Sequence, residues 1–235
     1  MAAWTEGILL GFDTETTGVD VDSDRVVTAA LVAQDSGGTS ERTWLIDPGI
    51  DIPEQATAVH GITTAHAREH GAAPAEALEE VAQVIAGALG QGGVLVVFNA
   101  AYDLAIMRAE LRRHGLPTLE ERLGREVSPV VDPLVVDRKV ERFRKGKKTL
   151  ELMGAAYGVA ANEAAHTADG DVAHTLAVLR AITDKHPQLL EMSPEDLHRA
   201  QAEWHAEWAE NFEQYLRGKG RSDATIERAW PLPAA

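Results

Sequence analysis

The sequence contains no cysteine, and only 5% of its residues are aromatic. The absence of cysteine excludes disulfides, zinc–thiolate sites and thiol catalysis, and it fits a reducing compartment. No apolar stretch approaches the roughly 20 residues that a membrane-spanning helix needs. The amino-terminal residues also lack the basic region and uninterrupted apolar run of a secretory signal. We therefore expect a soluble, cytoplasmic protein with no membrane partner, and 235 residues suffice for a full hydrophobic core.

Positive charge is scarce in this chain. The formal net charge is −15, which by itself argues against nucleic-acid binding, because the phosphate backbone attracts Lys and Arg. Residues 138–148, RKVERFRKGKK, are the exception, with seven basic residues, one acidic residue and a local charge of +6. A solvated helix end and loop is the simplest interpretation of such a run. A contact with nucleic acid is the alternative, and the chemistry of the neighbouring residues decides between them.

Apolar patterning predicts a mixed α/β sheet. The predicted strands are 7–13, 25–34, 41–47 and 94–98. An amphipathic helix is predicted from Pro74, followed by helices at 100–115, 133–142, 149–157 and 170–185. Three strands in a meander, then a helix, a strand and a helix, indicate an α/β protein with helices against a mixed sheet.

Two carboxylates, Asp13 and Glu15, stand at the end of the first predicted strand. Side chains two residues apart in a strand lie on the same face, so these anions would be close enough to repel each other. Burial would favour their protonation unless a divalent cation lay between them. Asp103 and Asp171 add carboxylates at predicted helix starts, where α/β sheets form clefts. Each acid taken alone has a plainer explanation, as a turn residue or a charge that favours a helix start.

Four motifs occur in order: FDTETTG, HGIT, FNAAYDLAIM and HTADGDV. They resemble the motifs of the DEDDh branch of the DnaQ-like 3′–5′ exonucleases, and the resemblance covers about residues 7–185. It implies a ribonuclease H-like fold with a five-stranded mixed sheet flanked by helices. One position departs from the pattern, because Phe98 stands where many relatives have histidine. This departure is expected to alter the support of the site and to leave the catalytic set intact.

The resemblance also implies roles for individual residues. The four acids Asp13, Glu15, Asp103 and Asp171 would bind two divalent ions, with Asp13 shared between them, and His166 would be the general base. Oxygen ligands and the absence of cysteine favour Mg²⁺ or Mn²⁺ over zinc. The residues expected to contact the terminal nucleotide are Thr16, Thr17, Gly18, His60, Ile62, Asn99 and Tyr102. The alternative is a turn and a loop packed on the core, with Tyr102 as a core residue.

Such a site next to residues 138–148 favours the second interpretation of this basic segment, a contact with nucleic acid. Its residues Arg142, Arg144, Lys145, Lys147 and Lys148 are predicted to follow the backbone of a strand entering the cleft. Two aspartates nearby are predicted to have structural positions, Asp132 as a helix cap and Asp137 as a surface charge.

Residues 187–235 lie outside the resemblance and are predicted to form a helical extension of an exonuclease domain, residues 1–186. The sequence SPED at 193–196 predicts a capped helix start. Apolar and aromatic residues then recur along one side of this helix: Leu197, Trp204, Trp208, Phe212 and Tyr215. Packing against the nuclease body is the preferred interpretation, and docking of a second copy or of a polymerase is the alternative.

The function predicted from these features is metal-dependent 3′–5′ exonuclease activity. The enzyme would release nucleoside 5′-monophosphates from the 3′ end of single-stranded nucleic acid, with DNA favoured over RNA. An exoribonuclease that trims RNA or short oligomers is one alternative. A non-catalytic or weakly catalytic partner subunit, which docks on a polymerase through the C-terminal extension, is the other.

Overall fold

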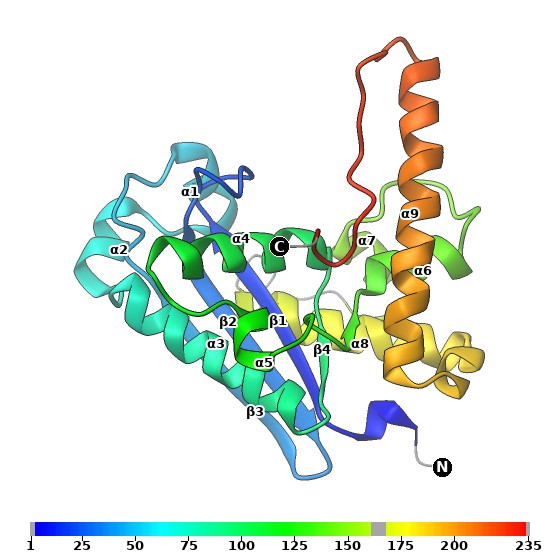
Figure 1. Ribbon diagram of the computed structural model, residues 1–235, viewed down its shortest axis with the longest axis horizontal. Helices are drawn as coiled ribbons and strands as arrows, with labels where there is room; N and C mark the ends of the chain where they lie inside the picture. Colours follow the sequence, from blue (N-terminus) through cyan, green and yellow to red (C-terminus); the bar gives the residue numbers. More distant parts are fainter. Residues whose placement is uncertain (1–2, 161–167, 234–235) are drawn as a thin grey trace.

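The computed structural model describes residues 3–160 and 168–233, with a single five-stranded sheet in the order β3-β2-β1-β4-β5 (Figure 1). The strands are β1 (Leu9–Thr16), β2 (Val26–Asp35), β3 (Gly38–Leu45), β4 (Val94–Val96) and β5 (Val130–Val131). β2 is antiparallel to β1 and β3, whereas β4 is parallel to β1 and β5. The predicted mixed five-stranded sheet is confirmed. The fifth strand has only two residues, and the sequence pattern did not locate it.

The predicted helices occur in the predicted order, and the structure has further short helices between them. They are α1 (Glu54–His60), α2 (Thr64–His70), α3 (Pro74–Gly90), α4 (Ala100–Arg113), α5 (Leu119–Leu123), α6 (Pro133–Val140), α7 (Leu150–Ala156), α8 (Ala168–Lys185) and α9 (Pro194–Gly218), with 3₁₀ turns at Trp4–Glu6 and Pro187–Glu191. Three short helices, α1, α2 and α5, were not predicted. The start of α5 did carry a signal, because Thr118 and Glu121 form a reciprocal capping box. Within the described ranges, no helix is both long and apolar enough to span a bilayer.

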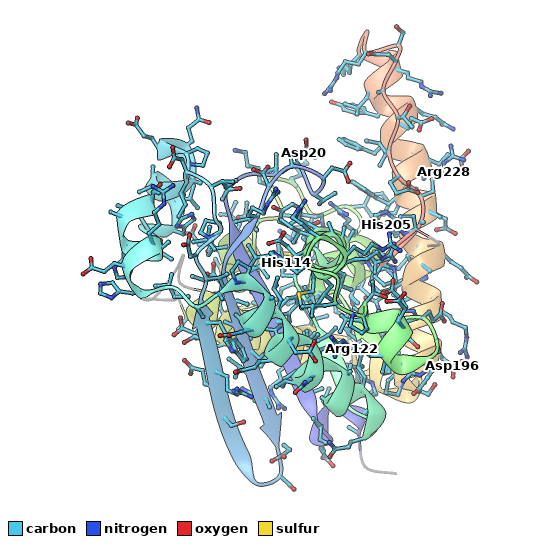
Figure 2. All side chains as sticks on the ribbon, turned by 60° about the vertical axis from the view of Figure 1, so that its left-hand side comes forward. Asp20, His114, Arg122, Asp196, His205 and Arg228 are labelled. Carbon is cyan, nitrogen blue, oxygen red and sulfur yellow. The ribbon has the colours of Figure 1, made fainter. Side chains whose placement is uncertain are left out.

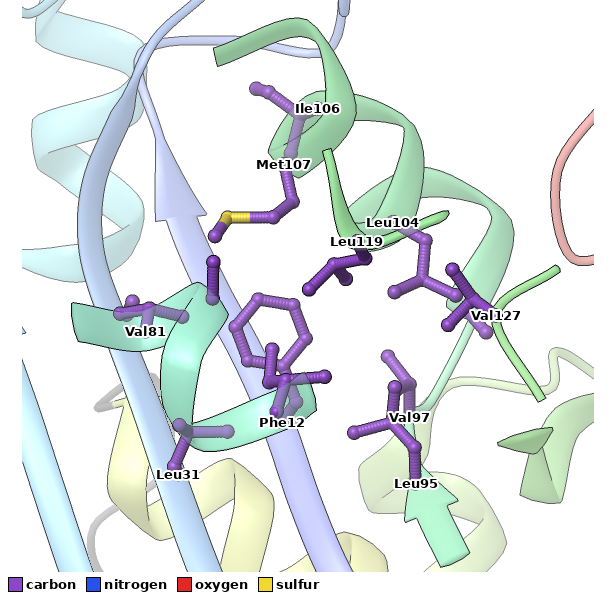
Figure 3. Packing of buried hydrophobic residues seen from close by; sticks show 14 of the residues in the cluster. Phe12, Leu31, Val81, Leu95, Val97, Leu104, Ile106, Met107, Leu119 and Val127 are labelled. Atoms are coloured by element: carbon purple, nitrogen blue, oxygen red, sulfur yellow. The ribbon is translucent and has the colours of Figure 1, made fainter. Parts of the chain in front are cut away.

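Alternate residues of β1 face two separate cores. Leu10 and Phe12 pack with α3 and α4 on one side (Figure 3), whereas Leu9 packs with α8 on the other. Gly11 also faces α8, where an added Cβ would lie 2.4 Å from a side-chain carbon of Val172. Because Gly11 has no side chain, α8 can approach the strand closely. This approach brings the start of α8 beside the carboxyl end of β1.

The C-terminal helix α9 covers the edge of the sheet at β5. An edge strand presents unpaired backbone groups on its outer side. Here the Val130 N–H donates to Nδ1 of His198 at 3.1 Å, and the Asp132 N–H donates to the side-chain oxygen of Gln201 at 2.8 Å. The Gln201 amide in turn donates to the Val130 carbonyl at 3.0 Å. Gln201 is completely buried, so α9 completes the sheet edge through side-chain hydrogen bonds.

After α9 the chain turns and runs back along the helix (Figure 1). His205 and Arg228 mark this contact in Figure 2: the His205 ring lies 3.1 Å from a carbonyl of the returning segment, and Arg228 is 3.8 Å from Glu213 of α9. Trp230 is buried and packs against His198, with ring centroids 5.2 Å apart. The C-terminal segment therefore packs on the body of the protein. The division of the chain into two domains stays a prediction.

Candidate active site

The carboxyl end of β1 and the start of α8 bring three carboxylates together. Asp13 and Glu15 lie on the α8 face of the strand, as the two-residue spacing predicted. Asp171 is in the first turn of α8. One oxygen from each of these three side chains lies within 4.8 Å of the others. Such a set of oxygens can hold a hard divalent cation.

Asp103 approaches from the opposite face of the sheet. It lies in the first turn of α4 and is 4% exposed. Its Oδ1 accepts hydrogen bonds from the Thr14 N–H at 3.1 Å and the Thr14 hydroxyl at 2.7 Å. Thr14 lies between the two acids of β1, so Asp103 is held next to the three-carboxylate cluster. It is not one of the three acids whose oxygens meet within 4.8 Å.

Burial and mutual repulsion raise the pKa values of the acids. Burial, followed by the charges of Asp103, Glu15 and Asp171, raises the pKa of Asp13 well above its usual range. Burial, followed by Asp171 and Asp103, raises the pKa of Glu15 to about 7. Burial likewise raises the pKa of Asp103 to about 7, against the opposing effect of its hydrogen bonds from Thr14. A divalent cation would remove this repulsion, so the donor set fits the ions that the motifs imply.

Asp132 supports the helix that carries Asp103. Its carboxylate accepts from the Leu134 N–H at 2.8 Å, which confirms the predicted cap, here at the start of α6. It also accepts from the Asn99 N–H at 3.1 Å and the Ala100 N–H at 3.0 Å. Asn99 precedes α4 in a left-handed conformation, with φ 63°, and gives that helix no side-chain cap of its own. One carboxylate therefore caps two helices, and the second cap was not predictable from local spacing.

A cleft of about 470 Å³ opens beside these acids. The lining residues are Asp13, Thr14, Phe98, Asn99, Tyr102, Asp103, Leu134, Lys148, Thr149 and Leu150. Two of the predicted substrate residues, Asn99 and Tyr102, are therefore in the same cleft as Asp13. The end of the basic segment forms part of the wall, at Lys148.

The other predicted substrate residues lie in two hollows that share Glu15. A hollow of about 360 Å³ is lined by Thr16, Thr17, Gly18 and His60 together with residues of α1, and His60 and Ile62 contribute to another of about 340 Å³. Burial lowers the pKa of His60, and its Nδ1 accepts from the Ile62 N–H at 3.1 Å.

The Thr-Thr-Gly turn is tied to the cleft by hydrogen bonds. The Thr16 hydroxyl is 2.7 Å from the Tyr102 hydroxyl, which donates to the Gly18 carbonyl at 2.5 Å. Thr17 is held differently, because its hydroxyl donates to Asp24 at 2.8 Å and it is 2% exposed. The contact between Thr16 and Tyr102 therefore connects the 360 Å³ hollow with the 470 Å³ cleft. Thr17 instead holds the turn through its hydrogen bond to Asp24.

The prediction that Asp137 is a surface charge was wrong. Its side chain is fully buried and accepts hydrogen bonds from Arg144 at 2.7 Å, from the Tyr157 hydroxyl at 2.9 Å and from Lys148. These donors come from the segment after α6 and from the end of α7, which fold over the carboxylate. A buried carboxylate needs such partners, because an unpaired one would be strongly destabilising.

The basic segment is therefore partly neutralised. Arg144 and Lys148 share one carboxylate, which leaves a single net positive charge on that cluster. Arg142, Lys145 and Lys147 make no ion pair with other residues of the described ranges, 3–160 and 168–233. All three side chains are exposed. His166, the predicted base, lies outside the described residues.

A family model and curated relatives match this chain. The RNase_T model, described as exonuclease, matches residues 10–179. An uncharacterized exonuclease of Escherichia phage 186 is 30% identical over 188 residues, which cover 76% of this chain and 90% of the phage protein. A DNA polymerase III subunit epsilon-like protein of Rhodobacter capsulatus is 33% identical over 183 residues, covering 73% of this chain and 23% of that protein. A PolC-type DNA polymerase III of Streptococcus thermophilus is 32% identical, and the match covers 57% of this chain and 8% of the polymerase.

Solved structures share the fold. Exonuclease I of E. coli, in complex with a dT13 oligonucleotide, superposes with a TM-score of 0.67 at 21% identity, over 79% of this chain and 43% of that chain. Exonuclease I of Methylocaldum szegediense gives a TM-score of 0.65 at 24% identity, over 78% of this chain and 42% of that chain. With the family match over most of the chain and the acid cluster at the end of β1, the protein belongs to the RNase_T exonuclease family and is a nuclease, as the DnaQ-like motifs predicted.

Proposed function

We propose that this nuclease removes nucleoside 5′-monophosphates from the 3′ end of single-stranded DNA. The observation that carries the proposal is the meeting of Asp13, Glu15 and Asp171 within 4.8 Å, next to the cleft that holds Asp103. In the reaction, water attacks the last phosphodiester. A new P–O bond forms, the bond from phosphorus to the 3′ oxygen breaks, and the shortened strand keeps a 3′-hydroxyl.

We propose that the acids would hold two divalent ions, Mg²⁺ or Mn²⁺. Asp13, Glu15, Asp103 and Asp171 are the residues that would hold them. Bound divalent ions would neutralise charge that develops on the phosphate oxygens and would help to activate the water. Thr14 keeps the Asp103 carboxylate oriented through two hydrogen bonds. Asn99 and Tyr102, in the wall of the cleft, would contact the terminal nucleotide.

His166 is assigned as the general base that accepts the proton of the attacking water. The ordinary pKa of histidine is about 6.5, which suits proton transfer near neutral pH. His166→Ala is expected to lower kcat by roughly 10²–10⁴-fold, the usual contribution of a general base, with metal binding largely kept. Single-turnover hydrolysis and Mn²⁺ binding measured on the same preparation test this. Full activity in the variant would show that another group accepts the proton.

DNA is favoured as substrate because exonuclease I, which shares the fold, was solved with a DNA oligonucleotide and the curated relatives include DNA polymerase III proteins. The decisive experiment is digestion of matched DNA and RNA, as single strands, duplexes and mismatched duplexes. Each substrate carries a label at the 5′ or the 3′ end and is incubated with Mg²⁺, Mn²⁺ or EDTA. We expect a progressively shortening ladder from 5′-labelled single-stranded DNA, immediate mononucleotide release from the 3′ label, and no reaction in EDTA. Faster turnover of RNA would instead make the protein an exoribonuclease.

Docking of a second copy or of a polymerase through α9 stays a prediction. Leu197 and Gln201, on the inner part of α9, are buried against the body of the protein. A partner would therefore have to use the outer part, where Tyr215 is 58% exposed.

A further inference from the structure

Residues 141–149, here called the basic loop, connect α6 to α7 and carry five basic residues and one acidic residue. The loop is held at its start, where Glu141 pairs with Lys185 at 2.5 Å, and further along by the buried Asp137. Arg144 and Lys148 both contact Oδ2 of the buried Asp137, and Lys148 also donates to the Glu141 carbonyl at 3.5 Å. Two positions four residues apart are thus held by the same carboxylate. The loop therefore has a defined position instead of being a free solvated run.

The fastened end of the basic loop is part of the catalytic cleft. Lys148 and Thr149 line the same 470 Å³ cleft as Asp13 and Asp103. Phe143 is five residues before Lys148, so it lies within about 18 Å of it even along a fully extended chain. The shared contact of Arg144 and Lys148 with Asp137 makes the actual path shorter. Phe143 is therefore close enough to meet a strand that leaves the cleft.

Phe143 is exposed to an unusual degree for an aromatic residue. Its relative exposure is 89%, and the Arg142 guanidinium carbon is 5.9 Å from the centre of its ring. Leaving such a side chain in water forgoes the stabilisation that its burial would contribute. A second copy of the chain would not cover it with the same loop, because the two basic loops would repel each other. A nucleobase with its phosphate matches both features, since a base stacks on an aromatic ring and the phosphate is attracted to the surrounding cations.

We propose that Phe143 is a stacking residue for a base of the single strand outside the catalytic cleft, with Arg142, Lys145 and Lys147 beside its phosphates. The inference rests on the proposed function, because it takes a nucleic-acid strand to be the substrate. The Asp137 carboxylate holds the loop that carries Phe143, through Arg144 and Lys148. The subsite would help the enzyme to hold a long strand while its 3′ end is in the cleft.

The test compares Phe143→Ala and Phe143→Trp with the wild-type protein. Fluorescence anisotropy in EDTA measures the affinity for a long single strand, first intact and then with one abasic nucleotide placed at successive distances from the 3′ end. We expect Phe143→Ala to weaken binding of the intact strand about 5- to 150-fold, the range for loss of one base–aromatic stack. Phe143→Trp should restore it. The wild-type protein should lose affinity at one abasic position, and Phe143→Ala should be insensitive there.

The controls separate stacking from charge and from catalysis. Lys145→Gln with Lys147→Gln should reduce the salt dependence of binding and keep the abasic sensitivity, because these residues act on phosphate. In Mg²⁺, turnover of a dinucleotide should fall far less in Phe143→Ala than turnover of the long strand. Unchanged long-strand affinity, equal losses on both substrates, or abasic sensitivity that survives in Phe143→Ala would each overturn the proposal. A wild-type protein that binds through Phe143 but hydrolyses neither DNA nor RNA would overturn the proposed function and leave this subsite standing.

Discussion

Asp13→Asn is expected to reduce hydrolysis below detection while the protein stays folded. Asp13 is one of three residues whose carboxylate oxygens lie within 4.8 Å, and an amide cannot supply its charge to a divalent ion. Bound divalent ions contribute several kcal/mol of charge stabilisation to such a transition state. The expected loss is therefore about 10⁴-fold or more. Release of labelled mononucleotide from a single strand in Mg²⁺ measures it.

The same substitution is expected to stabilise the metal-free protein near neutral pH. Burial and the neighbouring acids raise the pKa of Asp13 in the folded state, and the pKa of Glu15 is raised to about 7. Carboxyl groups with raised pKa values bind more protons in the folded than in the unfolded protein, so the free energy of unfolding falls as pH rises. This loss begins near the unfolded pKa of about 4 and continues through pH 7, where Glu15 ionises. Asn carries no charge and removes part of the repulsion.

Thermal unfolding in EDTA across this pH window measures the effect. The Tm of Asp13→Asn should equal that of the wild-type protein near the unfolded pKa and exceed it by at least about 2–4 °C above pH 7, the shift per kcal/mol for a chain of this size. Glu210→Gln removes an exposed carboxylate of α9 and serves as the control that changes neither Tm nor turnover. Normal turnover in Asp13→Asn, or no gain in Tm with rising pH, would contradict the assignment of these acids as a metal site.

Removal of residues 187–235 is expected to leave a protein that does not fold cooperatively. The deletion takes away Leu197 and Trp230, both buried, together with the side chains that pair with β5. Buried backbone groups without partners cost about 1–3 kcal/mol each. Circular dichroism during thermal unfolding and the elution volume of the purified fragment measure the outcome. A folded, fully active fragment would favour a docking role for the C-terminal segment.

A point substitution keeps this test informative if the fragment cannot be purified. Gln201→Leu removes the partners of the Asp132 N–H and the Val130 carbonyl, with an expected loss of about 2–6 kcal/mol in the free energy of unfolding. Tyr215→Ala, on the exposed outer part of the same helix, is the matched control and should change stability little. Urea unfolding of the two variants and the wild-type protein gives the comparison. Equal stability of all three would mean that α9 does not support the sheet edge.

Gln201→Leu should also lower the rate of hydrolysis, because hydrogen bonds connect Gln201 to the helix that carries Asp103. Gln201 holds the backbone N–H of Asp132, whose carboxylate caps the start of α4 at Asn99 and Ala100. Asp103 stands one turn further along that helix. The C-terminal helix is therefore connected to the active site by hydrogen bonds, although its sequence lies outside the family match, which ends at residue 179.

Local patterns predicted most of the helices and strands that position the acids. β1, β2, α3, α4 and α8 were all expected within a few residues of their observed bounds. Their signals are apolar periodicity and helix starts, which depend only on neighbours along the chain. The two-residue strand β5 and the short helices α1 and α2 carry too few residues for a periodic signal. β5 forms by pairing with β4, and the small cluster of Val27, Ile52 and Ala67 holds α2.

The sequence by itself determined that Asp13 and Glu15 share a face and that Asp103 and Asp171 begin helices, because side-chain direction and helix capping are local properties. Only the tertiary structure decided that Asp137 is buried under the basic loop, and that Gln201 reaches a backbone group 69 residues away. Those partners meet because α6, α7 and α9 pack at one edge of the sheet, and no spacing along the chain specifies that meeting.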